Sequence, residues 1–217
     1  LEAGAFAPDS YASLQAARNV LLDFKKSGKW IVAYGDIYTQ GAYYLASVAD
    51  KLYLNPQGQI DWHGLAAQPV FLKDMLAKVG VKMQVAKVGT YKSATEQFTG
   101  DKMSDADRAQ TTAYLNGIWQ NITKGVSESR KISVATLNQY ADSLITFAVP
   151  NEYQKLKLVD GLLYTDQVKK EVKKLLNIEE KKRINQLSLT DLKGIDDEDD
   201  GEEIAVYYAY GNIVDGN

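Results

Sequence analysis

The chain has 217 residues, with 25 basic and 28 acidic side chains, one His and no Cys. The lack of Cys excludes a disulfide, a thiolate nucleophile and a cysteine-based metal site, and the single His63 excludes a site with several His ligands. The net charge of −3 argues against nucleic-acid binding. We therefore expect no nucleic-acid partner, no metal and no cofactor.

Helices and strands are predicted to alternate along the first half of the chain. Apolar side chains at helical spacing predict helices over residues 10–27, 41–48 and 71–80. Short apolar or alternating runs predict strands over residues 30–34, 51–54 and 81–86, and Pro56 and Gly58 predict a turn over 56–59. This order, with short connections, predicts an α/β domain whose strands pair largely in parallel.

The second half is predicted to be mostly helical. Ser104 followed by Asp107 resembles a capping box, which predicts a helix from there to about Arg130. Further helices are expected over residues 133–142 and 165–176. Short strands are expected over residues 145–149 and 158–159, the second running into a turn at 160–161.

The last residues change character abruptly. Residues 195–203 are almost wholly acidic, which is typical of a solvated linker. Residues 204–217 are apolar again and predict the first strand of another domain, with a strand that pairs back onto the first sheet as the alternative. We expect residues 1–194 to form the first domain. Because the sequence begins at Leu1 without Met, we also expect it to be a piece of a longer protein.

Three groups of residues are candidates for chemistry but have plainer interpretations. His63 could act as a base, yet no Gly-x-Ser-x-Gly motif accompanies it, so a hydrogen-bonded His in a turn is favoured. The acidic residues 196–203 lack the spacing of a calcium loop. A Lys-rich helix is expected to present a solvated face, and its lysines are Lys169, Lys170, Lys173 and Lys174.

The segment from Val88 to Ala94 is a stronger candidate. It follows the predicted strand over 81–86, and Gly89 suggests a tight turn just before Lys92. Active sites of α/β folds lie beyond the carboxyl ends of strands. A lysine with its ordinary pKa of about 10.4 is protonated at pH 7, but burial among apolar groups lowers that value. A neutral lysine can then accept the proton of a serine hydroxyl.

Several stretches carry a resemblance to a known family. VGTYKSATEQF (88–98), with Asp101, Met103 and Ser104 after it, is similar to the lysine-bearing segment of the signal peptide peptidase A family in its long, two-domain form. YTQGAYYLASVADKLYLNPQGQIDWHG (38–64) is similar to the segment before it, and SGKWIVAYGD (27–36) and KLVDGL (157–162) also fit. The resemblance covers nearly the whole chain.

The resemblance implies a ClpP/crotonase-like β-α-β superhelix and a membrane-associated serine protease with a Ser–Lys dyad. Such a protease would degrade released signal peptides, assemble as a homotetramer, and lie at the bacterial inner membrane with its catalytic part on the periplasmic side. Lys92 matches the family's general base, and Gly89, Thr90 and Ser93 would shape the turn that directs it. Any membrane anchor would lie outside these residues.

The nucleophile of the family does not occur at the matching place. The family's carboxy-terminal domain has a Ser-Gly-Gly-Tyr-Tyr-like turn, and the similar turn here is Gln40-Gly41-Ala42-Tyr43-Tyr44. Gln40 cannot attack a carbonyl, and Thr39 beside it is expected to point elsewhere. Residues 204–216 resemble the first strand of the carboxy-terminal domain. The serine is therefore expected outside this chain, which alone would be inactive.

Two alternatives remain open. The domain could be a non-catalytic scaffold or peptide-binding domain of the same fold, with Lys92 as an ordinary salt-bridging lysine. It could also be a crotonase-like domain that handles acyl-CoA, although nothing in the sequence marks a CoA pocket.

Overall fold

The computed structural model describes residues 1–2, 4, 10–188 and 191. Leu1–Glu180 form one unit and Lys181–Asn217 a second. In the second unit, the carboxylate of Asp191 accepts hydrogen bonds of 2.7 Å from the backbone NH and the hydroxyl of Ser188. The predicted linker over 195–203 and the predicted strand over 204–217 lie outside the described residues, so both stay predictions.

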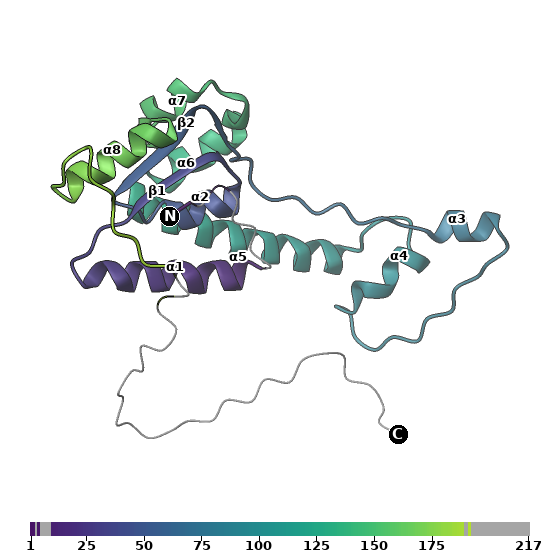
Figure 1. Cartoon of the computed structure of the whole chain (residues 1–217). Helices are drawn as coiled ribbons and strands as arrows, with labels where there is room; N and C mark the ends of the chain where they lie inside the picture. Colours follow the sequence, from purple (N-terminus) through teal and green to yellow (C-terminus); the bar gives the residue numbers. More distant parts are fainter. Residues whose placement is uncertain (3, 5–9, 189–190, 192–217) are drawn as a thin grey trace, which may run out of the picture. The chain divides into compact units, whose positions relative to one another are not determined.

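The first unit contains a parallel sheet with the order β1-β2-β3. The strands are β1 (Val32–Tyr38), β2 (Lys51–Ile60) and β3 (Gly161–Leu162). Both strand pairs are parallel. Parallel neighbours need a crossover, and the helix α2 (Gln40–Ala46) supplies it between β1 and β2 (Figure 1). The predicted α/β architecture with parallel pairing is thus confirmed.

The turn predicted over 56–59 is wrong, because these residues lie inside β2. Gly35 pairs with Leu54, and the pairing resumes only where Ile37 meets Gln59. Residues 55–58 therefore bulge outward opposite a single residue of β1. A Cβ on Gly58 would lie 2.4 Å from the carbonyl oxygen of Asp36, so this position needs glycine. Pro56 and Gly58 mark a bulge rather than the end of a strand.

Helices supply most of the remaining structure. They are α1 (Tyr11–Lys26), α3 (Lys73–Lys78), α4 (Glu96–Thr99), α5 (Asp105–Arg130), α6 (Val134–Asp142), α7 (Pro150–Lys155) and α8 (Thr165–Leu175), with 3-10 helices η1 (Ser93–Thr95) and η2 (Ile145–Phe147). Ser10 caps α1 by accepting a hydrogen bond from the NH of Ser13, as predicted. Ser104 caps α5 in the same way through the NH of Asp107.

Two predicted strands in the second half are wrong. Residues 145–147 form η2 instead, after Leu144 in a left-handed conformation with φ of 52°, and Pro150 begins α7 soon afterwards. Ala148 and Val149 are extended, but they pair with none of the described strands. The strand expected over 158–159 lies slightly later, as β3, because Leu158 and Val159 pack into the core ahead of it.

The core gathers around α2 and the aromatic side chains of the neighbouring elements. Trp62 is fully buried, and its ring lies 5.7 Å from that of Tyr43 and 5.0 Å from that of Trp119, measured between centroids. Arg18 of α1 is also buried, and its guanidinium donates to the carbonyl oxygens of Tyr44 and Gly125. This arginine therefore ties α1 to both α2 and α5.

A long connection between β2 and α5 carries α3, η1 and α4. We call residues 64–103 the arm. The strand predicted over 81–86 does not form there among the described residues, although its apolar side chains Val81, Met83 and Val85 alternate as expected. These side chains are exposed, since no described strand pairs with this segment. An alternating pattern alone does not make a strand without a partner.

Candidate functional site

Lys92 lies in the arm, at the residue immediately before η1. Its side chain is exposed, and no hydrogen bond or ion pair joins it to another described residue. Gly89 has a φ of +100°, which L side chains rarely adopt, so the turn before Lys92 needs this glycine. Thr90 is exposed and Ser93 half-buried. The expectation that Lys92 follows a strand is wrong, since residues 81–88 are not a strand.

Lys92 borders an open hollow of about 470 Å³. Its lining comes mainly from the arm and includes Lys87, Tyr91 and Thr95, with Gln110 contributed by α5. The hydroxyl oxygen of Thr95 is buried and has no hydrogen-bond partner in the described chain. The hollow therefore holds two lysines and an unsatisfied hydroxyl, but no described acid–base partner for Lys92.

One carboxylate lies close behind this hollow, on α4. Glu96 is 8% exposed, and its Oε1 accepts a hydrogen bond of 2.9 Å from the hydroxyl of Ser104. Its Oε2 accepts one of 3.2 Å from the NH of Ser104, and Lys87 Nζ lies 3.5 Å from Oε1. Hydrogen bonds from Ser104, assisted by the ammonium group of Lys87, hold the pKa of Glu96 below its ordinary value.

Sequence reasoning missed Glu96 as a buried charge. Nothing local distinguishes a Glu at the start of a four-residue helix from any surface Glu. Its contact with Ser104 spans eight positions and depends on where the arm turns back toward α5. The only available signal was that Ser104 is an N-cap and that carboxylates are favoured near helix N-termini.

Gln40, at the nucleophile's place in the similar turn, serves a structural role. Its side chain is 5% exposed, and its Oε1 accepts hydrogen bonds from the NH groups of His63 and Gly64 at 3.2 and 3.0 Å. Its Nε2 donates to the carbonyl oxygen of Gly64 at 3.1 Å. The neighbouring Thr39 caps α2 by accepting from the NH of Ala42. The side chains of Gln40 and Thr39 are thus both hydrogen-bonded to backbone groups.

The plainer interpretation of His63 agrees with its surroundings. The imidazole of His63 is exposed and its Nε2 lies 3.2 Å from Oδ2 of Asp61, two residues away. No serine hydroxyl is bonded to its ring in the described structure. His63 thus has a neighbouring carboxylate but no nucleophile.

The other charged candidates also fit their structural interpretations. Two of the four lysines of α8 form surface ion pairs, Lys174 with Glu171 at 2.6 Å and Lys170 with Glu180 at 3.5 Å. The acidic residues 196–203 lie outside the described residues. Within residues 1–2, 4, 10–188 and 191, no cluster of three or more His, Asp or Glu side chains could hold a metal.

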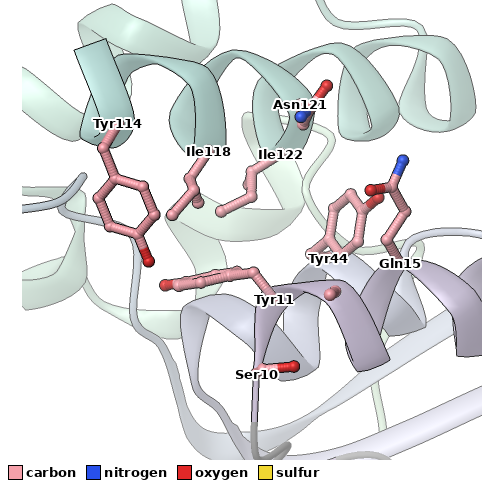
Figure 2. Close-up of a pocket in the computed structure, with 9 residues that line it drawn as sticks. Ser10, Tyr11, Gln15, Tyr44, Tyr114, Ile118, Asn121 and Ile122 are labelled. Atoms are coloured by element: carbon pink, nitrogen blue, oxygen red, sulfur yellow. The ribbon is translucent and has the colours of Figure 1, made fainter. Parts of the chain in front are cut away.

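A second pocket, of about 310 Å³, lies between the start of α1 and the middle of α5 (Figure 2). Tyr11 and Tyr114 face each other across its mouth, and Ile118 and Ile122 line its α5 side. Its lining includes no charged side chain, and its one serine, Ser10, is the N-cap of α1. It therefore offers no carboxylate, lysine or histidine for acid–base catalysis.

In the described part of the chain, no helix is long and apolar enough to cross a membrane. A match to the model of "Peptidase family S49" extends over residues 23–179. This stretch includes the sheet, the arm with Lys92, and helices α5 to α8.

Curated proteins that resemble the chain are proteases. Protease 4 of Salmonella typhi is 37% identical over 211 residues, which is 94% of this chain and 34% of that protein. Protease 4 of Haemophilus influenzae is 46% identical over 109 residues, which is 50% of this chain and 18% of that protein.

A third relative, the chloroplastic serine protease SPPA of Arabidopsis thaliana, is 29% identical over 188 residues, which is 85% of this chain and 27% of that protein. The chain spans about a third or less of each relative. Since the family model covers most of the chain, the chain belongs to peptidase family S49, and its parallel α/β domain has the ClpP/crotonase fold.

Proposed function

We propose that this chain is the amino-terminal part of a serine endopeptidase that degrades released signal peptides with a Ser–Lys dyad. Lys92 is the general base of that dyad: its amine takes the proton of the serine hydroxyl, returns it to the leaving amine, and then activates the water that releases the acyl-enzyme. The serine comes from a second domain outside these residues.

The observation that carries this proposal is the availability of Lys92. Its neighbour in the same hollow, Lys87, is engaged by the carboxylate of Glu96. The side chain of Lys92 is exposed and makes no hydrogen bond or ion pair within the described chain. A lysine without a carboxylate partner can face a hydroxyl, whereas a salt-bridged one is held in its charged form.

The exposure of Lys92 also supports the need for a second domain. A lysine acts as a base near neutral pH only when burial or a like charge disfavours its ammonium form. The described residues leave the hollow open on one side. The domain that brings the serine would cover this side and remove water from the pair. The structural role of Gln40 fits a division of the dyad between two domains.

The remaining expectations extend this proposal to the whole protein. Its substrates are peptides, its subunits assemble as a homotetramer around the sites, and the complete protein is anchored at the bacterial inner membrane with the catalytic part on the periplasmic side. Membership of a peptidase family favours this function over acyl-CoA chemistry. A non-catalytic scaffold is the remaining rival, because no hydroxyl of the described chain is hydrogen-bonded to the Lys92 amine.

The first test uses the purified chain of 217 residues and a quenched fluorescent peptide that carries the apolar segment of a signal peptide. We expect no turnover above the peptide's background hydrolysis, and turnover once the rest of the protein is present. Robust cleavage by the chain alone, abolished by Lys92→Ala, would contradict the shared dyad. Full activity of the complete protein with Lys92→Met would favour the scaffold.

A further inference from the structure

The arm between β2 and α5 needs something to hold its turn in one conformation. Most residues around Lys92 are exposed, and η1 and α4 contain only three and four residues. Short exposed helices are marginal by themselves. Yet a general base must approach its hydroxyl with defined geometry, because small displacements of a reacting group slow catalysis strongly.

Glu96 is the one acidic side chain that the described chain buries. A buried carboxylate is costly unless hydrogen bonds or a cation compensate it. Here Ser104 provides both its hydroxyl and its NH, and Lys87 provides an ammonium group. The carboxylate of Glu96 is therefore ionised, and both Ser104 and Lys87 compensate its burial.

These partners lie on opposite sides of Lys92 in the sequence. Lys87 precedes Lys92 by five residues, and Ser104 follows it by twelve. Ser104 is also the N-cap of α5, a helix of 26 residues whose Ile122 and Val126 are buried in the core. Glu96 thus joins the segment before the turn to the start of a long helix whose second half packs into the core.

We propose that Glu96 is a positioning residue for Lys92. Its carboxylate closes the loop from Lys87 to Ser104 and so sets the direction in which the lysine meets the serine hydroxyl. This inference rests on the proposed function of Lys92. Glu96 itself does not touch substrate; it acts through the backbone of the turn.

The experiment measures kcat and KM of the complete protein with the quenched signal-peptide substrate for four single variants. Glu96→Gln removes the charge while nearly preserving side-chain shape, and Lys87→Met removes one of its partners. Lys92→Met removes the proposed base. Asp101→Asn is the matched control, because Asp101 is an exposed carboxylate five residues away in the same arm.

We expect Glu96→Gln to lower kcat by roughly tenfold to a hundredfold, as for a displaced catalytic group, with KM changed less than about twofold. Lys87→Met should lower kcat less, since Ser104 still holds the carboxylate. Asp101→Asn should match the unaltered protein. Amide hydrogen exchange over residues 88–95 should speed up in Glu96→Gln, with exchange in α1 and α2 unchanged.

Each contrary outcome has a separate meaning. If Lys92→Met abolishes cleavage while Glu96→Gln keeps the kcat of Asp101→Asn, the positioning role is wrong and the proposed function stands. If kcat falls in Glu96→Gln together with faster exchange in α1 and α2, Glu96 serves the stability of the fold and the inference is overturned. Full activity of Lys92→Met overturns the proposed function and this inference with it.

Discussion

Arg130, the last residue of α5, forms a two-fold hydrogen-bonded ion pair with Asp160. Its Nη1 donates to Oδ2 at 3.2 Å and its Nη2 to Oδ1 at 2.8 Å. The same carboxylate accepts a hydrogen bond of 2.7 Å from the NH of Leu52, whose carbonyl oxygen accepts from the NH of Asp160 at 2.8 Å. The pair therefore fastens the end of α5 to β2, just where β3 begins. These contacts join residues that are 30 and 108 positions apart in the sequence.

The first prediction concerns the pH dependence of stability. Burial acts to raise the pKa of Asp160, but hydrogen bonds from Arg130 and Leu52 outweigh it and hold that pKa below its ordinary value. Such a group contributes stability above its unfolded pKa of 3.8, and this contribution is lost as the pH falls through the lower folded value. In denaturant unfolding between pH 6 and about 2, Asp160→Asn should show a shallower loss of stability than the unaltered chain. Equal slopes would contradict the role of this pair.

The second prediction uses two glycines of the same helix. A Cβ on Gly125 would lie 2.7 Å from the ring of Tyr44 and 3.2 Å from Nε of Arg18, whereas one on Gly117 would meet nothing within 4 Å. Gly125→Ala should therefore destabilise the chain by about 1–3 kcal/mol through overpacking. Gly117→Ala should stabilise it by about 0.5–1 kcal/mol because alanine favours the helix.

Thermal and denaturant unfolding of these two variants measure how closely α5 packs on α1 and α2. The two substitutions are chemically identical, so helix propensity cancels in their comparison. Similar effects of both alanines would mean that α5 does not approach Tyr44 as described.

The third prediction concerns Gln40. Gln40→Ala would leave the NH groups of His63 and Gly64 without their acceptor and should cost about 1–3 kcal/mol of stability. The exposed Gln139→Ala on α6 is the matched control and should change stability by less than about 0.5 kcal/mol. Gln40→Ser should create no peptidase activity in the isolated chain, because the side chain at position 40 is hydrogen-bonded to backbone groups and to no base. Measurable cleavage by that variant would refute this interpretation.

The sequence predicted those elements whose signals are local. Ser10 and Ser104 mark helix starts because their hydroxyls cap nearby NH groups, and the helices α1 and α5 begin where expected. The parallel sheet followed from alternating helices and strands. The bulge at Gly58 was mistaken for a turn, because its cause is the carbonyl oxygen of Asp36 on the neighbouring strand.

In the candidate site, too, the sequence predicted local features but not contacts between distant residues. Gly89 could be placed in a tight turn from its residue type alone, and its φ of +100° agrees. The segment over 81–86 has the alternating apolar pattern of a strand, but no described strand pairs with it. The pattern therefore predicted a strand that does not form. The burial of Glu96 arises from contacts with Ser104 and Lys87 that only the fold brings together.

The most direct test of the account is the rate of peptide cleavage by the complete protein carrying Lys92→Met. The control is Lys102→Met, which removes an exposed lysine from the same arm. If Lys92 is the general base, kcat/KM should fall by about a hundredfold to ten-thousandfold in Lys92→Met while the fold stays intact. In Lys102→Met, kcat/KM should stay unchanged. Cleavage by Lys92→Met at the rate of the control would contradict the Ser–Lys dyad.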